Sequence, residues 1–132
     1  MAEIVFEVCA NSLQSALNAE EGGAHRVELC ADLPAGGITP SAATIIKTIK
    51  TIGIPVFVMI RSRPGNFVYN DFEFEIMKED IAFTKKFGAK GLVFGLLTDK
   101  AKIDIERCKT LVKQAYPMEC TFHMATVDRQ WG

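Results

Sequence analysis

Two short stretches of this chain place an acidic residue and a cysteine two positions apart at the end of an apolar run. They are Phe6-Glu7-Val8-Cys9-Ala10 and Val27-Glu28-Leu29-Cys30-Ala31. Because alternate side chains of a strand point to opposite faces, the acid and the thiol of each stretch would share one face. Two such strands side by side would bring two thiols and two carboxylates into one small volume. The pattern therefore indicates a candidate site.

The thiols of Cys9 and Cys30 are candidate ligands for copper. Soft thiolate and thioether groups select Cu(I), and thiols on adjacent strands about 4.8 Å apart would give a two-coordinate site. Twenty residues separate the two cysteines, so they form no Cys-x-x-Cys signature, and a buried free cysteine is also commonly a small apolar core residue. Metal binding and core packing both stay open for this pair. Cys108, in a predicted helix, and Cys120, at the start of a predicted strand, are expected to be structural.

The carboxylates of Glu7 and Glu28, with the imidazole of His123 at the end of the last predicted strand, are candidate acid–base groups. Carboxylates within apolar strands are rarely buried without a partner. The structural alternative is an ion pair with one of three arginines: Arg26, Arg61 and Arg63. The functional alternative is a catalytic or substrate-binding role at the mouth of a barrel, where the carboxyl ends of strands meet.

A second set of residues would suit an anionic ligand such as phosphate or a carboxylate. Arg61 and Arg63 follow the third predicted strand, and Gly36 and Gly37 form a turn before a helix. Guanidinium groups and backbone N–H groups at a helix start both favour anions. Tyr69 would add a hydroxyl. Three separate elements therefore favour an anion site near the thiols.

The bulk composition is that of an ordinary globular domain. The 132 residues are 48% hydrophobic and 23% charged with a net charge of −1, and this balance argues against nucleic acid and anionic membrane surfaces as partners. The first residues lack the positive segment and apolar core of a signal peptide, and no apolar run approaches about 20 residues. We therefore expect a single cytoplasmic domain over residues 1–132, with reduced cysteines.

Strand and helix patterns alternate strictly along the chain. Predicted strands cover residues 4–9, 26–30, 54–60, 91–94 and 120–123, and predicted helices lie between them, beginning near residues 13, 41, 71 and 105. The second helix is expected to start with Thr39 as N-cap and Pro40 as its first residue. Such alternation predicts a parallel α/β sheet, either open and doubly wound or part of a (β/α)8 barrel. The absence of Gly-x-Gly-x-x-Gly after the first strand, and polar residues at several strand ends, favour the barrel.

These residues resemble the family of the copper homeostasis protein CutC. The matching segments are Glu7-Val8-Cys9, Gly23-Ala24-His25-Arg26-Val27-Glu28-Leu29-Cys30, Gly36-Gly37-Ile38-Thr39-Pro40-Ser41, Val58-Met59-Ile60-Arg61, Phe67-Val68-Tyr69, Gly91-Leu92-Val93-Phe94-Gly95-Leu96-Leu97-Thr98 and Thr121-Phe122-His123. The resemblance implies a TIM-type barrel fold and a role in copper handling, with copper bound through Cys9 and Cys30.

The chain also departs from the family pattern. Residues 124–132 do not match it, and Asn66 stands where the family has an acidic residue in the loop after the third strand. A (β/α)8 barrel takes roughly 200 residues or more, so this chain encodes about four and a half units. A half-barrel would leave strand edges unpaired and an apolar face exposed to solvent. We therefore expect either a homo-oligomer, a dimer or higher, or a truncated product, or a sequence that continues.

Three functions follow as hypotheses. The first is a cytoplasmic copper homeostasis protein that binds Cu(I) for buffering, trafficking or sensing. The alternative is a barrel enzyme that acts on a small anionic substrate, with Glu7, Glu28 and His123 as acid–base groups and Arg61 and Arg63 as anion clamps. The third is a truncated variant without full activity. Fold alone cannot separate them, because barrels host many chemistries.

Overall fold

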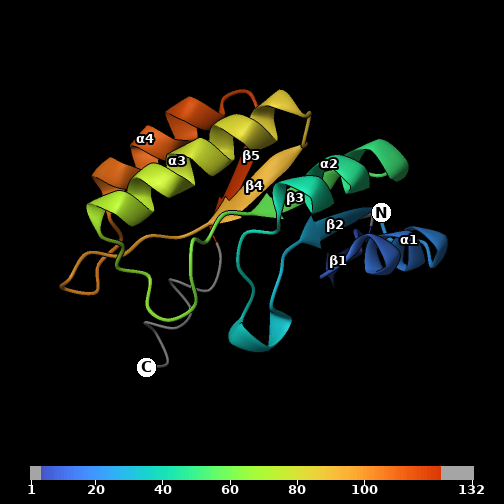
Figure 1. The fold of residues 1–132 in the computed structure, drawn as a ribbon, viewed down its shortest axis with the longest axis horizontal. Helices are drawn as coiled ribbons and strands as arrows, with labels where there is room; N and C mark the ends of the chain where they lie inside the picture. Colours follow the sequence, from blue (N-terminus) through green and yellow to red (C-terminus); the bar gives the residue numbers. More distant parts are fainter. Residues whose placement is uncertain (1–3, 123–132) are drawn as a thin grey trace.

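The structure is a computed structural model, which describes residues 4–122. Within them, strands and helices alternate, and the five strands form one parallel sheet in chain order (Figure 1). The strands are β1 (Glu7–Ala10), β2 (Arg26–Leu29), β3 (Val56–Met59), β4 (Gly91–Phe94) and β5 (Glu119–Phe122). The helices are α1 (Leu13–Glu21), α2 (Ala42–Thr51), α3 (Asp71–Lys86) and α4 (Ile105–Ala115). This arrangement confirms the predicted α/β fold, a half-barrel of the TIM type.

The apolar core lies between the sheet and the helices. One set of alternate strand residues, which includes Val27, Leu29, Val58, Leu92 and Phe94, is fully buried there. Helices α2, α3 and α4 follow one another across this face of the sheet (Figure 1). The opposite set of alternate residues faces the inside of the half-barrel. That inner face carries the polar residues and cysteines of the two Glu-x-Cys stretches.

The two outermost strands of the sheet are unlike the central ones. Every residue of β3 and β4 is buried, whereas β2, which pairs with the outer strand β1, alternates partly buried and buried residues. In β1 and β5 most residues are exposed, since each is paired on one side alone within the described part of the chain. The half-barrel therefore has two open edges.

Some element boundaries differ from those predicted. Helix α2 begins later than expected, with Ser41 as its N-cap, whose hydroxyl accepts the N–H of Thr44. Thr39, the predicted cap, is instead bound to the end of β3: its Oγ1 accepts the backbone N–H of Arg61 at 2.8 Å. A tertiary hydrogen bond has thus replaced the local one. Strand β5 ends at Phe122, and His123 lies outside the described residues.

Among residues 4–122, no helix combines the length and the apolar character that crossing a bilayer requires.

Candidate functional site

A hollow of about 560 Å³ opens on the inner face of the half-barrel, beneath the loop that follows β2. Its lining combines the two Glu-x-Cys stretches with residues of the later strands: Glu7, Cys9, Glu28, Cys30, Leu33, Gly36, Met59, Val93, Thr121 and Phe122. The register of the sheet explains this meeting. Cys9 of β1 lies opposite Glu28 of β2, and Glu7 lies opposite Arg26. Two thiols and two carboxylates therefore do share one space.

The carboxylate of Glu7 has a cationic partner within the sheet. Arg26 Nε lies 2.6 Å from Glu7 Oε2, an ion pair whose angle is not that of a hydrogen bond. The guanidinium also stacks over the ring of Phe57, with 4.6 Å from its central carbon to the ring centroid. Of the three arginines expected as partners for these acids, Arg26 is the one that lies beside them. Its packing against Phe57 fixes where Glu7 points.

Glu28 lies in a less favourable electrostatic position than Glu7. Burial raises the pKa of its carboxyl group, and the neighbouring carboxyl of Glu7 raises it further through its charge and a hydrogen bond. The Arg26 guanidinium lowers the same pKa, by a smaller amount. Glu28 is thus a carboxyl group that holds its proton to a higher pH than an ordinary glutamate.

Both thiols of the hollow are also shifted toward their protonated form. The Cys9 thiol lies 4.0 Å from Glu28 Oε2, and burial, followed by the charges of Glu28 and Glu7, raises its pKa. Cys30 is only 1% exposed, and burial is the main reason its pKa rises to about 11. At neutral pH the site therefore presents two thiols rather than two thiolates, beside acceptors for their protons.

Gly37 packs directly against the sulfur-containing side chains of Met59 and Cys30, which line the hollow. It has a φ of +91°, and a methyl group placed on it would lie 2.9 Å from Met59 Sδ and 3.3 Å from Cys30 Cβ. Only glycine combines that backbone conformation with so close an approach. Met59 and Cys30 are therefore neighbours beneath this turn, so a thioether stands beside the buried thiol.

Arg61 holds together the loops that follow β2 and β3. Its Nη1 donates to the carbonyls of Ala35 and Gly37, at 3.0 and 2.9 Å, and its Nη2 donates to Gly65 O at 2.7 Å. A methyl group on Gly36 would lie 3.0 Å from Arg61 Nη1, which explains the glycine there. The Arg61 side chain is buried, and its Nε has no hydrogen-bond partner.

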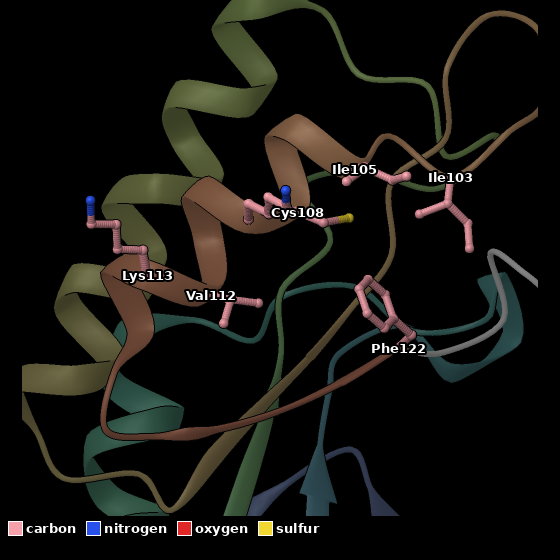
Figure 2. Close-up of a pocket in the computed structure, with 7 residues that line it drawn as sticks. Ile103, Ile105, Cys108, Val112, Lys113 and Phe122 are labelled. Carbon is pink, nitrogen blue, oxygen red and sulfur yellow. The ribbon is translucent and has the colours of Figure 1, made fainter.

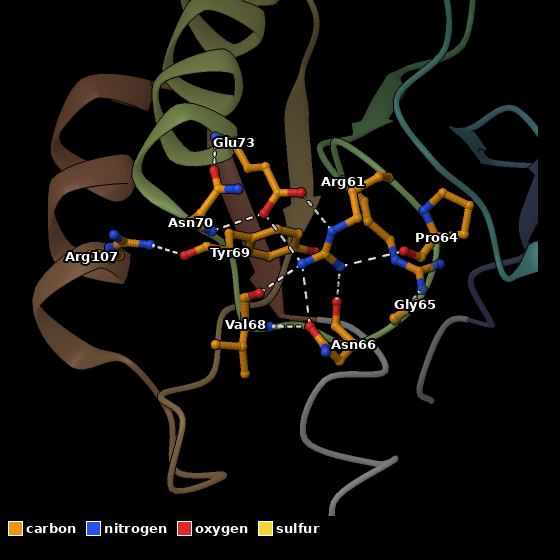
Figure 3. Close-up of polar contacts among 10 residues, drawn as sticks. Arg61, Pro64, Gly65, Asn66, Val68, Tyr69, Asn70, Glu73 and Arg107 are labelled. Carbon is orange, nitrogen blue, oxygen red and sulfur yellow. Dashed lines mark hydrogen bonds and ion pairs between the residues drawn. The ribbon is translucent and has the colours of Figure 1, made fainter.

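Arg63 is the centre of a second polar network, and its partners Asn66, Val68 and Glu73 are labelled in Figure 3. Its Nε donates to Glu73 Oε2 at 2.7 Å, and its Nη2 donates to Val68 O at 2.6 Å and to Asn66 Oδ1 at 3.2 Å. Glu73 also forms a capping box with Asn70 at the start of α3, and its Oε1 accepts the Asn70 N–H at 2.8 Å. The loop between β3 and α3 is thus tied to the first turn of the helix.

Tyr69 lies between the two arginines. The Arg63 guanidinium stacks on its ring at 4.8 Å, while its hydroxyl is buried without a hydrogen-bond partner of good geometry. Burial raises the pKa of this hydroxyl, and the charges of Arg61 and Arg63 lower it. The structure therefore groups the residues predicted for an anion, with the Gly36 and Gly37 turn against Arg61, and their role as an anion site stays a prediction.

Some residues of these networks were missed by sequence reasoning. Arg107 of α4 donates to Tyr69 O and to Asp71 Oδ1, both at 2.7 Å, and so ties the loop to a distant helix. No local sequence pattern predicts this contact of Arg107. The Asn70-x-x-Glu73 spacing, by contrast, is a capping-box signature that the sequence does carry. His123, predicted as an acid–base group, lies outside the described residues.

Comparison with known proteins places the chain in a family. A sequence model of the CutC family matches residues 4–129. A relative from Homo sapiens, named copper homeostasis protein cutC homolog, is 50% identical over 121 residues, which are 92% of this chain and 44% of the relative. The solved structure of a copper homeostasis protein CutC from Streptococcus agalactiae superposes with a TM-score of 0.88 at 38% identity, over 98% of this chain and 65% of that chain.

More distant structures share the fold alone. Thiamine phosphate pyrophosphorylase from Pyrococcus furiosus gives a TM-score of 0.53 at 18% identity, over 86% of this chain and 50% of that chain. The chain spans about half the length of the curated relatives it matches. The family model covers nearly all of this chain, and the human relative is identical to it at half of the 121 matched residues. The chain belongs to the CutC family.

Proposed function

We propose that this chain takes part in copper homeostasis in the cytoplasm by binding Cu(I) through Cys9 and Cys30. The observation that carries the proposal is that both thiols line the same hollow, with the Met59 thioether beside Cys30. Thiolate and thioether sulfur are the ligands that favour Cu(I). The names of the relatives, which refer to copper homeostasis, support the same conclusion.

The donor set suits Cu(I) better than a divalent ion. Within residues 4–122, no group of three or more His, Cys, Asp and Glu side chains is arranged to hold a metal ion. Zinc and similar ions take four ligands in structural sites, whereas two thiolates satisfy Cu(I). The pair of thiols at Cys9 and Cys30 therefore suits a cargo ion that takes two ligands.

The site is suited to reversible handling of the ion. Thiols must lose their protons to bind a metal, so the raised pKa values of Cys9 and Cys30 moderate the affinity. Such moderation fits buffering, trafficking or sensing, in which the ion must also be released. In a reducing cytoplasm both thiols would remain free to bind the ion.

The test compares two pairs of cysteines of the same chain. Cys9→Ser with Cys30→Ser should abolish Cu(I) binding in an anaerobic titration against a competing chelator. Cys108→Ser with Cys120→Ser, the matched control, removes two thiols outside the hollow and should leave binding intact. Equal binding by the first double variant and the parent would overturn the proposal.

A second candidate function rests on Glu28. A carboxyl group with a raised pKa in a hollow is typical of acid–base catalysis, and here it would act with Glu7 and His123 on a small anion held near Arg61 and Arg63. Crystals grown with inorganic phosphate should then show an ordered anion near Arg61 and the turn at residues 36–37. Bulk solvent alone there would contradict the enzyme hypothesis. Failure of both tests would favour a variant without full activity.

A further inference from the structure

A third sulfur atom borders the hollow beside the two thiols, in the side chain of Met59. Leu29 of β2 lies opposite Val58 of β3, so the next residues of the two chains, Cys30 and Met59, are neighbours on the inner face. Both are buried, since Cys30 is 1% and Met59 is 5% exposed. The thioether therefore lines the hollow from the strand next to that of Cys30.

The turn at Gly37 limits where the sulfur of Met59 can lie. A methyl group placed on Gly37 would lie 2.9 Å from Met59 Sδ and 3.3 Å from Cys30 Cβ, so both side chains reach the same point beneath the turn. The turn is itself held in place, because Gly37 O accepts a hydrogen bond from Arg61 Nη1 at 2.9 Å. On its other side Met59 is paired in register with Val93, whose side chain offers no ligand atom. The thioether is thus kept on the side of Cys30.

The three sulfur-containing residues belong to three consecutive strands of the sheet. Cys9 lies in β1, Cys30 directly follows β2, and Met59 is the last residue of β3. After burial, the charge of Cys9 is the next cause of the raised pKa of Cys30, so the two thiols are within electrostatic reach of each other. Cys30 is therefore the shared neighbour of the exposed Cys9 thiol and the buried Met59 thioether.

Cys108 is a buried thiol without such neighbours. It lies on α4 in a separate apolar pocket of about 440 Å³, with Val112 and Phe122 (Figure 2). Among the described residues that line this pocket, Cys108 alone contains sulfur. Burial raises its pKa to about 11, as it does that of Cys30. Burial alone therefore does not distinguish Cys30 from Cys108, whereas the sulfur atoms beside Cys30 do.

The oxygen donors of the hollow are less suited to a soft ion. Glu7 Oε2 lies 2.6 Å from Arg26 Nε, and that ion pair already uses its charge. Glu28 lies beside Cys9, but carboxylate oxygen is a hard ligand that suits divalent ions better than Cu(I). Thiolates bind Zn(II) as well as Cu(I), so the two thiols do not by themselves select between these ions. The thioether is the donor in this hollow that favours Cu(I) alone.

We propose that Met59 joins Cys9 and Cys30 as a third ligand of Cu(I) and sets the preference of the site for Cu(I) over Zn(II). The inference rests on the proposed copper function and goes beyond it, because that function needs only the two thiols. A thioether is uncharged and has no proton to lose, so it adds a soft ligand without adding charge. Zn(II) gains little from it, since zinc sites in proteins are built from thiolate, imidazole and carboxylate.

Selenium labelling tests this ligand directly. The chain contains five methionines, and selenomethionine can replace all of them. X-ray absorption of the labelled, Cu(I)-loaded chain should show a copper–selenium contact. Met77→Leu, the matched control, removes a fully buried methionine of α3 outside the hollow and should keep this contact. Met59→Leu should abolish it, and a contact that persists in that variant would assign the ligand to another methionine and overturn the proposal.

Affinities for two ions then test the selectivity. Met59→Leu nearly conserves side-chain volume, so the packing beneath Gly37 should be retained. In anaerobic competition titrations this variant should bind Cu(I) about tenfold more weakly than the parent, a loss of about 1.4 kcal/mol of binding free energy. Its affinity for Zn(II) should equal that of the parent, and Met77→Leu should change neither affinity. An equal loss for both ions would show that Met59 acts through packing, and would overturn its role in selectivity.

The outcomes also separate this inference from the copper proposal. A parent chain that binds no Cu(I), or binds it equally well after Cys9→Ser with Cys30→Ser, would overturn both. A parent that binds Cu(I) through these cysteines but shows no copper–selenium contact would overturn only the assignment of Met59. The labelled parent gives this answer without any substitution, so a variant that fails to fold does not obscure it.

Discussion

Cys9 Sγ lies 4.0 Å from Glu28 Oε2, across the pair formed by β1 and β2. The contact follows from the register, which sets Cys9 directly opposite Glu28. The contact places the Cys9 thiol, which must lose its proton before it can bind a metal, beside the Glu28 carboxylate, which can accept a proton. The negative charge of the same carboxylate raises the pKa of the Cys9 thiol and so opposes the loss of its proton.

Removal of the Glu28 charge should make Cys9 more reactive. The negative charge of Glu28 contributes to the raised pKa of the Cys9 thiol, so Glu28→Gln should lower that pKa and increase the thiolate fraction near neutral pH. We expect Cys9 to be alkylated faster by iodoacetamide at pH 8, because a lower thiol pKa raises the thiolate fraction. Peptide-resolved mass spectrometry measures this rate.

Glu21→Gln is the matched control for this experiment. It removes one carboxylate from an exposed position of α1, outside the hollow, and should not change the alkylation of Cys9. An unchanged or slower rate in Glu28→Gln would show that the carboxylate acts on Cys9 through packing or hydrogen bonding rather than through charge.

Copper affinity should rise with pH. Both thiols have pKa values above the ordinary 9.0, so each is protonated below pH 8 and must release its proton when Cu(I) binds. Release of one proton makes the apparent affinity increase about tenfold per pH unit, and release of two about a hundredfold. Anaerobic competition titrations between pH values of about 6 and 8, corrected for protonation of the chelator, measure the slope. An affinity independent of pH would mean that other groups bind the ion.

The alternation of strands and helices, and the meeting of the two Glu-x-Cys stretches, could be predicted because both depend on local periodicity. Polar residues spaced two apart mark one face of a strand, and parallel strands in chain order bring those faces together. Cys9 and Glu28 are therefore neighbours for reasons that a single sequence reveals.

The roles of the loop residues could not be predicted in the same way. Arg61 is a strong candidate for an anion from its type alone, yet three backbone carbonyls occupy its Nη groups. Those carbonyls are in position because Gly37 has a positive φ and Thr39 is bonded to the end of β3. Such contacts depend on how distant loops fold over one another, and no local pattern encodes them.

Gly91 should be intolerant of any side chain. A methyl group there would lie 2.7 Å from Glu119 O of β5 and would clash with the ring of Phe57. We expect Gly91→Ala to lower the free energy of unfolding by about 1–3 kcal/mol, the usual cost of an overpacked core. Chemical denaturation measures the loss. Gly53→Ala is the control, because its methyl group would meet only the flexible end of Glu20 at 3.3 Å; equal losses would contradict this explanation.

Arg63→Lys should lower the free energy of unfolding and should also reduce the further loss of stability at acid pH. The arginine bonds Glu73 and the loop at several points, which a lysine ammonium cannot reproduce, so the free energy of unfolding should fall by about 1–3 kcal/mol. The hydrogen bonds from Arg63 and the Asn70 N–H hold the pKa of Glu73 below its ordinary 4.5. That stabilisation is present above pH 4.5 and is lost as the pH falls through the lower, folded-state value.

The acid response separates this network from a simple surface ion pair. Denaturation at a series of pH values should show a smaller loss of stability below pH 4.5 in Arg63→Lys than in the parent, because less stabilisation depends on the ionised Glu73. Glu75→Gln removes the exposed pair with Lys78, whose atoms are 2.7 Å apart, and should cost less than about 0.5 kcal/mol. If both variants lost the same stability with the same pH profile, Arg63 would be only a surface charge, and the loop after β3 would owe its conformation to Arg61 alone.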